Sequence, residues 1–204
     1  MLPETLPDEI TMEKTPRYFV ASEVPERVYK MSPNTKLVIV MSDPVIRAIS
    51  DFTQAVSKND LKYNVTFRKR VIRRNGEINL RSSIIKTGMY ARYLSIWLQY
   101  FNMKNIHVIS GEDLLNDPVK VLEGLQDFIE LPRAIQSNLI YFNKTRGFNC
   151  IYMKQRSNPA KCFGETKGRQ HIATDSDTLQ RLYRFYKPYN EYLFKMINKT
   201  FHWS

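Results

Sequence analysis

The stretch KLVIVMSDP at positions 36–44 decides the fold of this 204-residue chain. Positions 36–41 form a nearly continuous apolar run rich in β-branched residues, which is typical of a strand buried on both faces of a parallel sheet. Behind this run, Asp43 can cap a helix and Pro44 fits the first turn of that helix. The stretch therefore predicts a strand, a tight turn and a helix.

Helical spacing continues behind this turn. Apolar side chains recur there about one turn apart, at Val45, Ile49, Phe52 and Val56. Further along the chain, residues 106–109 have the composition of a second buried strand, and residues 119–129 have the pattern of an amphipathic helix. Strands that alternate with helices favour an α/β fold with a mainly parallel sheet flanked by helices.

The other elements are predicted from shorter patterns. Residues 9–16 have the pattern of a short strand ended by a proline, and residues 25–30 that of a short helix. A long helix is expected after the turn at Asn75-Gly76, with one face formed by Tyr90, Leu94, Trp97, Leu98 and Phe101. Residues 141–169 are expected to form a hairpin and loop, and two helical segments broken near Pro188 are expected to close the chain.

The predicted parallel sheet indicates where a ligand would bind. In such sheets, ligands bind at the carboxyl ends of the strands. We therefore expect Lys14, the Ser42-Asp43 turn and the Ser110-Gly111-Glu112 turn to lie at this edge. We call it the carboxyl edge.

The composition fits a soluble globular domain with a polyanionic partner. A chain of this length is expected to form one domain, residues 1–204, with residues 1–9 poorly ordered. Lys and Arg number 31 against 20 Asp and Glu, which gives a net charge of +11. This charge favours nucleic acid, anionic lipid or a sulfated polysaccharide as partner, and a solvated basic surface without a special partner is the alternative.

The sequence also bears on the compartment. No apolar run approaches the roughly 18–20 residues that span a membrane, so we expect any targeting segment or anchor upstream of this sequence. Cys150 and Cys162 suit either a disulfide-closed loop or two free cysteines. Glycosylation sequons at Asn64, Asn143 and Asn198 add weak support for a secretory location.

Four ordered blocks of residues resemble one known family. They are Glu13-Lys14-Thr15-Pro16 with Tyr18-Phe19; Asp43-Pro44 with Arg47-Ala48-Ile49-Ser50-Asp51 and Thr53-Gln54; Tyr141-Phe142-Asn143-Lys144-Thr145 with Gly147-Phe148; and Cys162 with Thr166-Lys167-Gly168-Arg169 and His171. In this order, from about residue 10 to the C-terminus, the blocks resemble the heparan sulfate glucosamine 3-O-sulfotransferases. Thr200-Phe201 and Trp203 at the C-terminus also look like the ending of these enzymes.

The resemblance implies an activity, a fold and partners. The family transfers a sulfo group from 3′-phosphoadenosine 5′-phosphosulfate (PAPS) to the 3-hydroxyl of a glucosamine in heparan sulfate, and releases 3′-phosphoadenosine 5′-phosphate (PAP). Its fold is a P-loop-like α/β sandwich, and its location is the Golgi. The chain is then expected to bind heparan sulfate and no nucleic acid, since it has no recognisable reader motif. No cluster has metal-ligand spacing, so no metal is expected.

The resemblance also assigns roles to residues. It places Lys14 in the catalytic cleft and in contact with the sugar chain, and Ser50 on the 3′-phosphate of the donor. Gln54 matches a position that contacts the sugar chain. Cys150 and Cys162 match the disulfide pair of the family, whose short loop would be worth about 2–3 kcal/mol.

The basic turn after the second cysteine is the other expected donor contact. Lys167, Gly168 and Arg169 are expected to close over the donor and, through the two cations, to touch the polysaccharide. Gln170 and His171 follow as support for this cofactor loop.

Ser42 departs from the pattern of the family. Most relatives have an arginine there, which clamps the 3′-phosphate with a charge-assisted hydrogen bond worth about 1.5–3 kcal/mol. Serine keeps at most a neutral hydrogen bond, so we expect donor binding to be weaker by roughly 10- to 100-fold unless another residue compensates. Arg47 is one candidate for that compensation.

Two parts of the family pattern have no match. No G-x-x-x-x-G-K-[ST] stretch is present, and the donor loop, the first strand and the glutamate base of the family are expected upstream of this sequence. Glu13 is a poor substitute base, because strand alternation would point it away from Lys14. The leading hypothesis is thus an incompletely represented sulfotransferase. A non-catalytic heparan-sulfate-binding module and a nucleic-acid-binding protein are the alternatives.

Overall fold

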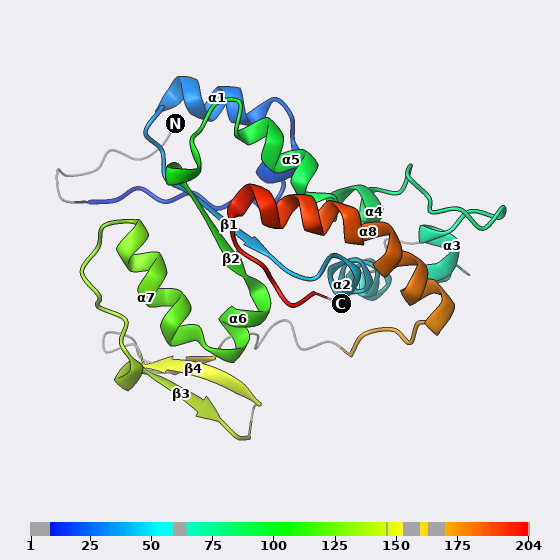
Figure 1. Ribbon diagram of the computed structural model, residues 1–204. Coiled ribbons are helices and arrows are strands. Elements are labelled where there is room, and N and C mark those ends of the chain that lie inside the picture. The colour runs from blue at the N-terminus through cyan, green and yellow to red at the C-terminus, as the bar shows by residue number, and fades with distance from the viewer. Residues whose placement is uncertain (1–8, 59–64, 146, 153–159, 163–169, 204) are drawn as a thin grey trace.

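The protein combines a small parallel sheet, a separate antiparallel sheet and eight labelled helices in the part of the chain that is described (Figure 1). The computed structural model describes residues 9–58, 65–145, 147–152, 160–162 and 170–203. The helices are α1 (Val24–Met31), α2 (Pro44–Ser57), α3 (Phe67–Val71), α4 (Ser83–Thr87), α5 (Tyr90–Trp97), α6 (Gly111–Asn116), α7 (Pro118–Phe128) and α8 (Ser176–Ile197). The strands are β1 (Leu37–Met41), β2 (Ile106–Ser110), β3 (Ile140–Asn143), β4 (Phe148–Tyr152) and β5 (Ala160–Cys162). Short 3-10 turns lie at Tyr18–Val20, Met103–Asn105 and Ser137–Leu139.

The predicted strand–turn–helix unit is confirmed. β1 pairs in parallel with β2, in a register that sets Leu37 opposite Ile106 and Met41 opposite Ser110. The carboxylate of Asp43 caps α2 by accepting hydrogen bonds from the backbone N–H groups of Val45, at 2.7 Å, and Ile46, at 3.3 Å. The local sequence thus positions the start of α2 directly behind β1.

The prediction that β1 is buried on both faces is wrong. Met41 is buried, but Val38 and Val40 on the other face are 43% and 56% exposed. Side chains alternate between the faces of a strand, so burial of both faces requires a covering layer on each. Within the described residues, only the face with Leu37, Ile39 and Met41 packs into a core cluster.

Two hydrophobic clusters form the core, and α8 contributes to both. The first joins α2, α3 and α4 to Leu182 and Tyr186 of α8. The second joins β1, β2 and α5 to Leu193 of α8 and to Phe201. Figure 1 shows α8 crossing the molecule between these regions. Because α8 spans both clusters, it ties the α2 side of the fold to the sheet.

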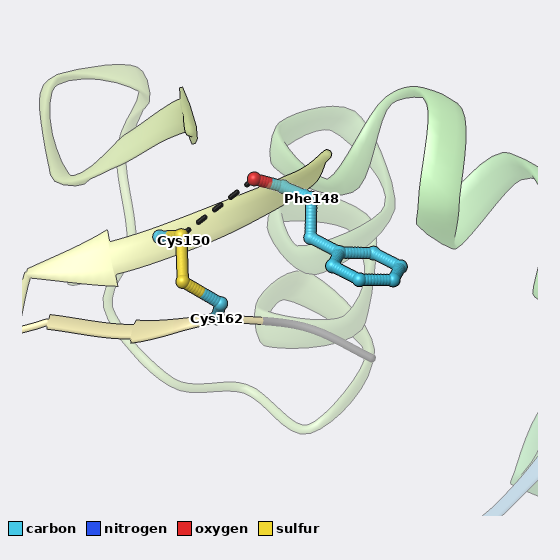
Figure 2. The surroundings of a disulfide bond; sticks show 3 residues. All are labelled: Phe148, Cys150 and Cys162. Carbon is cyan, nitrogen blue, oxygen red and sulfur yellow. Dashed lines mark hydrogen bonds between the residues drawn. A yellow bond between two sulfur atoms is a disulfide. The ribbon is translucent and has the colours of Figure 1, made fainter. Parts of the chain in front are cut away.

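The antiparallel sheet has the order β3-β4-β5 and lies apart from β1 and β2 (Figure 1). Cys150 on β4 is paired with Cys162 on β5, and the two form a disulfide (Figure 2). The disulfide is thus confirmed, and no free cysteine remains. The expected hairpin is confirmed with a third strand added, so the prediction of a mainly parallel sheet holds for β1 and β2 alone.

Three predicted elements differ from the structure. Residues 9–16 form no strand, because a strand needs a neighbour for its backbone groups and the described partner of β1 is β2 alone. The predicted long helix is interrupted at Gly88, where a Cβ would lie only 2.8 Å from the Tyr186 hydroxyl of α8. The predicted break near Pro188 is absent: α8 continues through it, with Pro188 on the exposed side of the helix.

Three further expectations concern membrane spans, metal sites and the order of the N-terminal residues. None of the described helices is both long and apolar enough to cross a membrane. His, Cys, Asp and Glu side chains of the described ranges form no group of three that could hold a metal ion. The expected poor order of residues 1–9 falls, apart from Glu9, outside the described residues.

Candidate functional site

The turns after β1 and β2 meet at the carboxyl edge, as the sequence predicted. The backbone N–H of Asp43 donates a 2.9 Å hydrogen bond to Oε1 of Glu112. Gly111 allows this approach, since a Cβ there would clash with the hydroxyl of Ser42. The two turns therefore form one hydrogen-bonded unit, although 69 residues separate Asp43 from Glu112.

Glu112 also fixes the C-terminal segment. Its Oε2 accepts hydrogen bonds from Oγ of Ser110, at 3.1 Å, and from the indole Nε1 of Trp203, at 3.2 Å. Oγ of Ser110 in turn accepts from the backbone N–H of Asp113 at 3.0 Å and so caps α6. With both oxygens bound to donors, this carboxylate is a structural link between three segments.

Tyr90 of α5 is bound to the carboxyl edge by a hydrogen bond. Its hydroxyl donates a 2.9 Å hydrogen bond to the carbonyl oxygen of Ser42, and its ring lies 5.8 Å from that of Trp203. Burial raises the pKa of Tyr90 far above its usual range, against the opposite effects of the Arg47 charge and the hydrogen bond to Ser42. The hydrogen bond from this hydroxyl holds the backbone of Ser42 in place.

Arg47, the candidate compensator for Ser42, is already engaged. Its guanidinium binds the carboxylate of Asp51 and the carbonyl oxygen of Ile84, while its buried Nε has no hydrogen-bond partner in the described structure. Burial raises the pKa of Tyr186 to about 12, and Arg47 acts in the opposite direction. Arg47 thus links α2 to α4, and any role on a phosphate would require it to leave these partners.

Ser50 and Gln54 lie one turn apart on the exposed side of α2. They follow Ser42 by eight and twelve residues, and Ser42 itself lies before Asp43, the N-cap of α2. Ser42 itself is half-buried, whereas Ser50 and Gln54 are exposed. The structure thus places Ser50 and Gln54 together on α2, and Ser42 at the turn before this helix, with its hydroxyl beside Gly111.

The segment of Gln170 and His171 lies beside α2. The backbone N–H of Ile172 donates a 3.3 Å hydrogen bond to Oγ1 of Thr53, the neighbour of Gln54, and both Gln170 and His171 are exposed. This contact spans 119 residues of sequence and brings the end of the predicted donor loop to the predicted sugar-contacting helix.

Lys14, Lys167, Gly168 and Arg169 are not placed at this site. Lys14 is exposed in the irregular segment before Tyr18–Val20, and no contact in the described structure joins it to the carboxyl edge. Because residues 9–16 form no strand, the alternation argument against Glu13 no longer applies. Lys167, Gly168 and Arg169 lie outside the described residues.

Comparison with known proteins identifies the family of this chain. Residues 6–195 match the family described as "Sulfotransferase domain". The chain belongs to this family.

Similar proteins give the resemblance more detail. The chain is 43% identical over 207 residues to "Heparan sulfate glucosamine 3-O-sulfotransferase 3B1" of Homo sapiens, a match that covers 100% of the chain and 52% of that protein. It is 40% identical to "Heparan sulfate glucosamine 3-O-sulfotransferase 6" of Mus musculus, with 100% and 59% covered. The resemblance inferred from the four blocks is therefore confirmed. The chain spans about half the length of these relatives.

A solved structure supports the fold. The sulfotransferase from Alicyclobacillus acidocaldarius matches with a TM-score of 0.65 at 18% sequence identity, covering 91% of this chain and 63% of that one. The sulfotransferase domain described here is therefore a mixed α/β structure with a small parallel sheet and helices, similar to sulfotransferases.

Sequence reasoning missed part of this sulfotransferase domain. It placed Glu112 at the carboxyl edge but gave it no partner, and it assigned Tyr90 and Trp203 no role there. The three side chains come from segments far apart in the sequence, and only their hydrogen bonds to the turns identify them. The one local feature that pointed to Glu112 was its place in the Ser110-Gly111-Glu112 turn, directly after a strand.

Proposed function

We propose that this chain is the larger part of a PAPS-dependent sulfotransferase domain that modifies the 3-hydroxyl of glucosamine in heparan sulfate. The observation that carries the proposal is the 43% identity over the whole chain to a heparan sulfate 3-O-sulfotransferase. On this proposal, residues 1–204 belong to one P-loop-like sulfotransferase domain that works in the Golgi, with the first strand and the donor loop outside this sequence.

The donor side is assigned to the β1–α2 unit. Ser42 and Ser50 bind the 3′-phosphate, and Lys167, Gly168 and Arg169 with Gln170 and His171 close over the donor. Support comes from Ser42 at the turn after β1, from Ser50 on the exposed side of α2 and from the contact of Ile172 with Thr53. The groups present fit a phosphate, since hydroxyls and cations are its ordinary protein ligands.

The acceptor side is assigned to Lys14 and Gln54, with Lys167 and Arg169. In the reaction, the acceptor oxygen forms a bond to sulfur as the bond from sulfur to the 5′-phosphate oxygen breaks, and the acceptor proton passes to a base. Lys14 is proposed to stabilise the charge of the transferring sulfo group. The base is assigned to no residue of this sequence.

A heparan-sulfate-binding module without transferase activity is the second candidate. It is favoured by Ser42, which stands where the resemblance implies an arginine, and by Arg47, whose guanidinium is already bound to Asp51 and Ile84. On this reading the 3′-phosphate has no charged ligand in the β1–α2 unit.

Restoring the arginine tests the proposal. We expect PAP to bind the chain measurably by calorimetry and Ser42→Arg to tighten that binding by about 10- to 100-fold, since one charge-assisted hydrogen bond is gained. Ser57→Arg is the matched control, because it adds the same charge at an exposed serine at the far end of α2 and is expected to change binding less than twofold.

Sulfo transfer decides between the two candidates. Transfer from labelled PAPS to heparan sulfate is measured with this chain and with any longer natural polypeptide that contains it. Transfer by either supports the enzyme. Heparan sulfate binding without transfer, and without PAP binding even in Ser42→Arg, would establish the binding module instead.

A further inference from the structure

Helix α3 and the first turns of α8 lie side by side at one end of the molecule (Figure 1) and carry many exposed cationic side chains. Residues 67–81 contain six cationic side chains and one acidic side chain. The α3–α8 basic surface consists of Arg68, Lys69, Arg70, Arg73, Arg74, Arg181 and Arg184, all of which are exposed. It is the densest group of like charges in the sequence, and the proposed transfer reaction uses none of it.

Salt bridges hold this surface together. Nη1 of Arg68 donates to Oδ2 of Asp177 and to Oγ1 of Thr178, each at 2.8 Å, and so joins α3 to the first turn of α8. An antiparallel bridge between Ile72 and Ile78 folds residues 73–77 into a turn beside α8. The basic residues therefore come from segments about 100 residues apart that are joined into one face.

The nearby acidic groups are already occupied. Asp175 caps α8 and pairs with Arg68, while Asp177 pairs with both Arg68 and Arg181. Four cations of the surface have no ion pair within the described structure: Lys69, Arg70, Arg74 and Arg184. Their charges are left available to an external polyanion.

An open cleft lies between α2 and this surface. The cleft has a volume of about 440 Å³ and is lined by Phe52 and Val56 of α2, Arg68 of α3, and Ile172 with Asp175 of the segment before α8. Ile172 is bound to Thr53, the neighbour of Gln54, and Asp175 is bound to Arg68. These contacts join α2, the helix that carries Gln54, to the basic surface.

We infer that the α3–α8 basic surface binds a sulfated polysaccharide outside the transfer site, as an extension of the acceptor site. The inference rests on the proposed function for the identity of the acceptor. Several cations on one surface fit a chain with repeated anionic groups. A single-stranded nucleic acid is held in part by base stacking on exposed aromatic rings. Phe67 of α3 is 3% exposed, and Tyr183 and Phe185, which flank Arg184, pack against the first core cluster.

The test compares two triple variants of equal charge. Arg70→Gln/Arg74→Gln/Arg184→Gln removes unpaired cations of the surface, and Arg27→Gln/Arg92→Gln/Lys120→Gln removes three exposed cations elsewhere. We expect the first to weaken binding of long heparan sulfate chains by about tenfold at 0.1 M salt, because three exposed charge contacts are lost. The second is expected to weaken it less than threefold, and Arg70→Lys/Arg74→Lys/Arg184→Lys to retain most of the binding.

The length of the acceptor polysaccharide distinguishes this surface from the transfer site. In an active polypeptide, the first variant should raise KM for long acceptor chains while leaving kcat, PAP affinity and KM for a hexasaccharide unchanged. Equal loss in both glutamine variants, wild-type binding by the first, or tighter binding to single-stranded RNA or phosphatidylserine vesicles than to heparan sulfate would overturn the inference. If the proposed transfer is wrong, PAP binding and transfer fail in the wild type too, whereas the difference between the variants in polysaccharide binding remains.

Discussion

Strands β1 and β2 send Met41, Ile106 and Val108 into a cluster of buried side chains, whereas the described side chains of β3, β4 and β5 that are buried are Cys150 and Cys162. The parallel sheet gains its stability from apolar surface removed from water. The antiparallel sheet leaves much of its apolar surface unburied, with Phe142 58% and Tyr152 49% exposed, and a disulfide joins two of its strands at a paired position. The chain therefore uses burial where helices cover a sheet and a covalent bond where they do not.

The largest effect is expected in the core of the parallel sheet. Leu94 is fully buried in the cluster that includes Met41 and Val108. We predict that Leu94→Ala lowers the free energy of unfolding by about 2–5 kcal/mol, because it loses buried apolar surface and leaves a cavity. Urea unfolding followed by circular dichroism measures this, with Leu115→Ala as control, since Leu115 is 56% exposed. If Leu94→Ala and Leu115→Ala lost the same unfolding free energy, burial of Leu94 would not explain the effect.

The second effect belongs to the antiparallel sheet. Replacing both Cys150 and Cys162 with serine removes a cross-link with a sequence separation of 12, which is worth about 3 kcal/mol in the loop-closure treatment. We predict faster amide hydrogen exchange in β4, with exchange in β1 and β2 within a factor of three of the wild type. If exchange in β1 accelerated as much as in β4, the two sheets would be one cooperative unit and the contrast between them would fail.

A smaller effect is expected at the carboxyl edge. Glu112→Ala removes the acceptor for Asp43, Ser110 and Trp203, and we predict a loss of about 1–3 kcal/mol in unfolding free energy. Glu112→Gln keeps one carbonyl oxygen as acceptor and is expected to lose less. Asp113→Ala serves as control, since Asp113 is an exposed neighbouring carboxylate. Denaturant unfolding ranks the three variants by their unfolding free energies. If Asp113→Ala lost as much as Glu112→Ala, the loss would come from removal of a negative charge and not from the hydrogen bonds of Glu112.

The smallest effect concerns the ion pairs outside both sheets. A hydrogen bond from Arg68 lowers the pKa of Asp177, and the backbone hydrogen bond from Thr178 lowers the pKa of Asp175. A lowered pKa means that the stabilisation is present above the ordinary value of 3.8 and is lost as pH falls through the lowered folded value.

Arg68→Gln separates the two carboxyl groups. We predict that it raises the pKa of Asp177 toward the ordinary value and moves the pKa of Asp175 less, since the main partner of Asp175 is Thr178. Titration of the carboxyl groups, followed by nuclear magnetic resonance, measures the pKa values of both Asp175 and Asp177. A larger shift at Asp175 than at Asp177 would contradict the assigned causes.

The sequence predicted the part of the candidate site that depends on neighbouring residues. Asp43 and Pro44 marked the start of α2, and two apolar runs placed the Ser42 and Ser110 turns at one edge, because parallel strands bring their carboxyl ends together. It did not predict the partners of Glu112, since Trp203 lies 91 residues away and nothing local connects the two.

Two errors in the predicted fold share a physical cause. Residues 9–16 have the composition of a strand, but strand formation depends on a neighbour that the segment itself does not supply. Pro188 disfavours a helix locally, but Tyr186 and Asn190 on either side of it are buried, and their packing holds α8 together. In both cases tertiary contacts outweighed local preference.

The sequence by itself determined the strand–turn–helix unit at 37–57, the cap at Asp43 and, through resemblance, the pairing of Cys150 with Cys162. Only the tertiary structure decided which face of β1 is buried, that Arg47 is bound to α4, and that Glu112 joins both turns to Trp203. The reason is range: capping and periodicity act over a few residues, whereas burial and long-range hydrogen bonds depend on which segments the whole fold brings together.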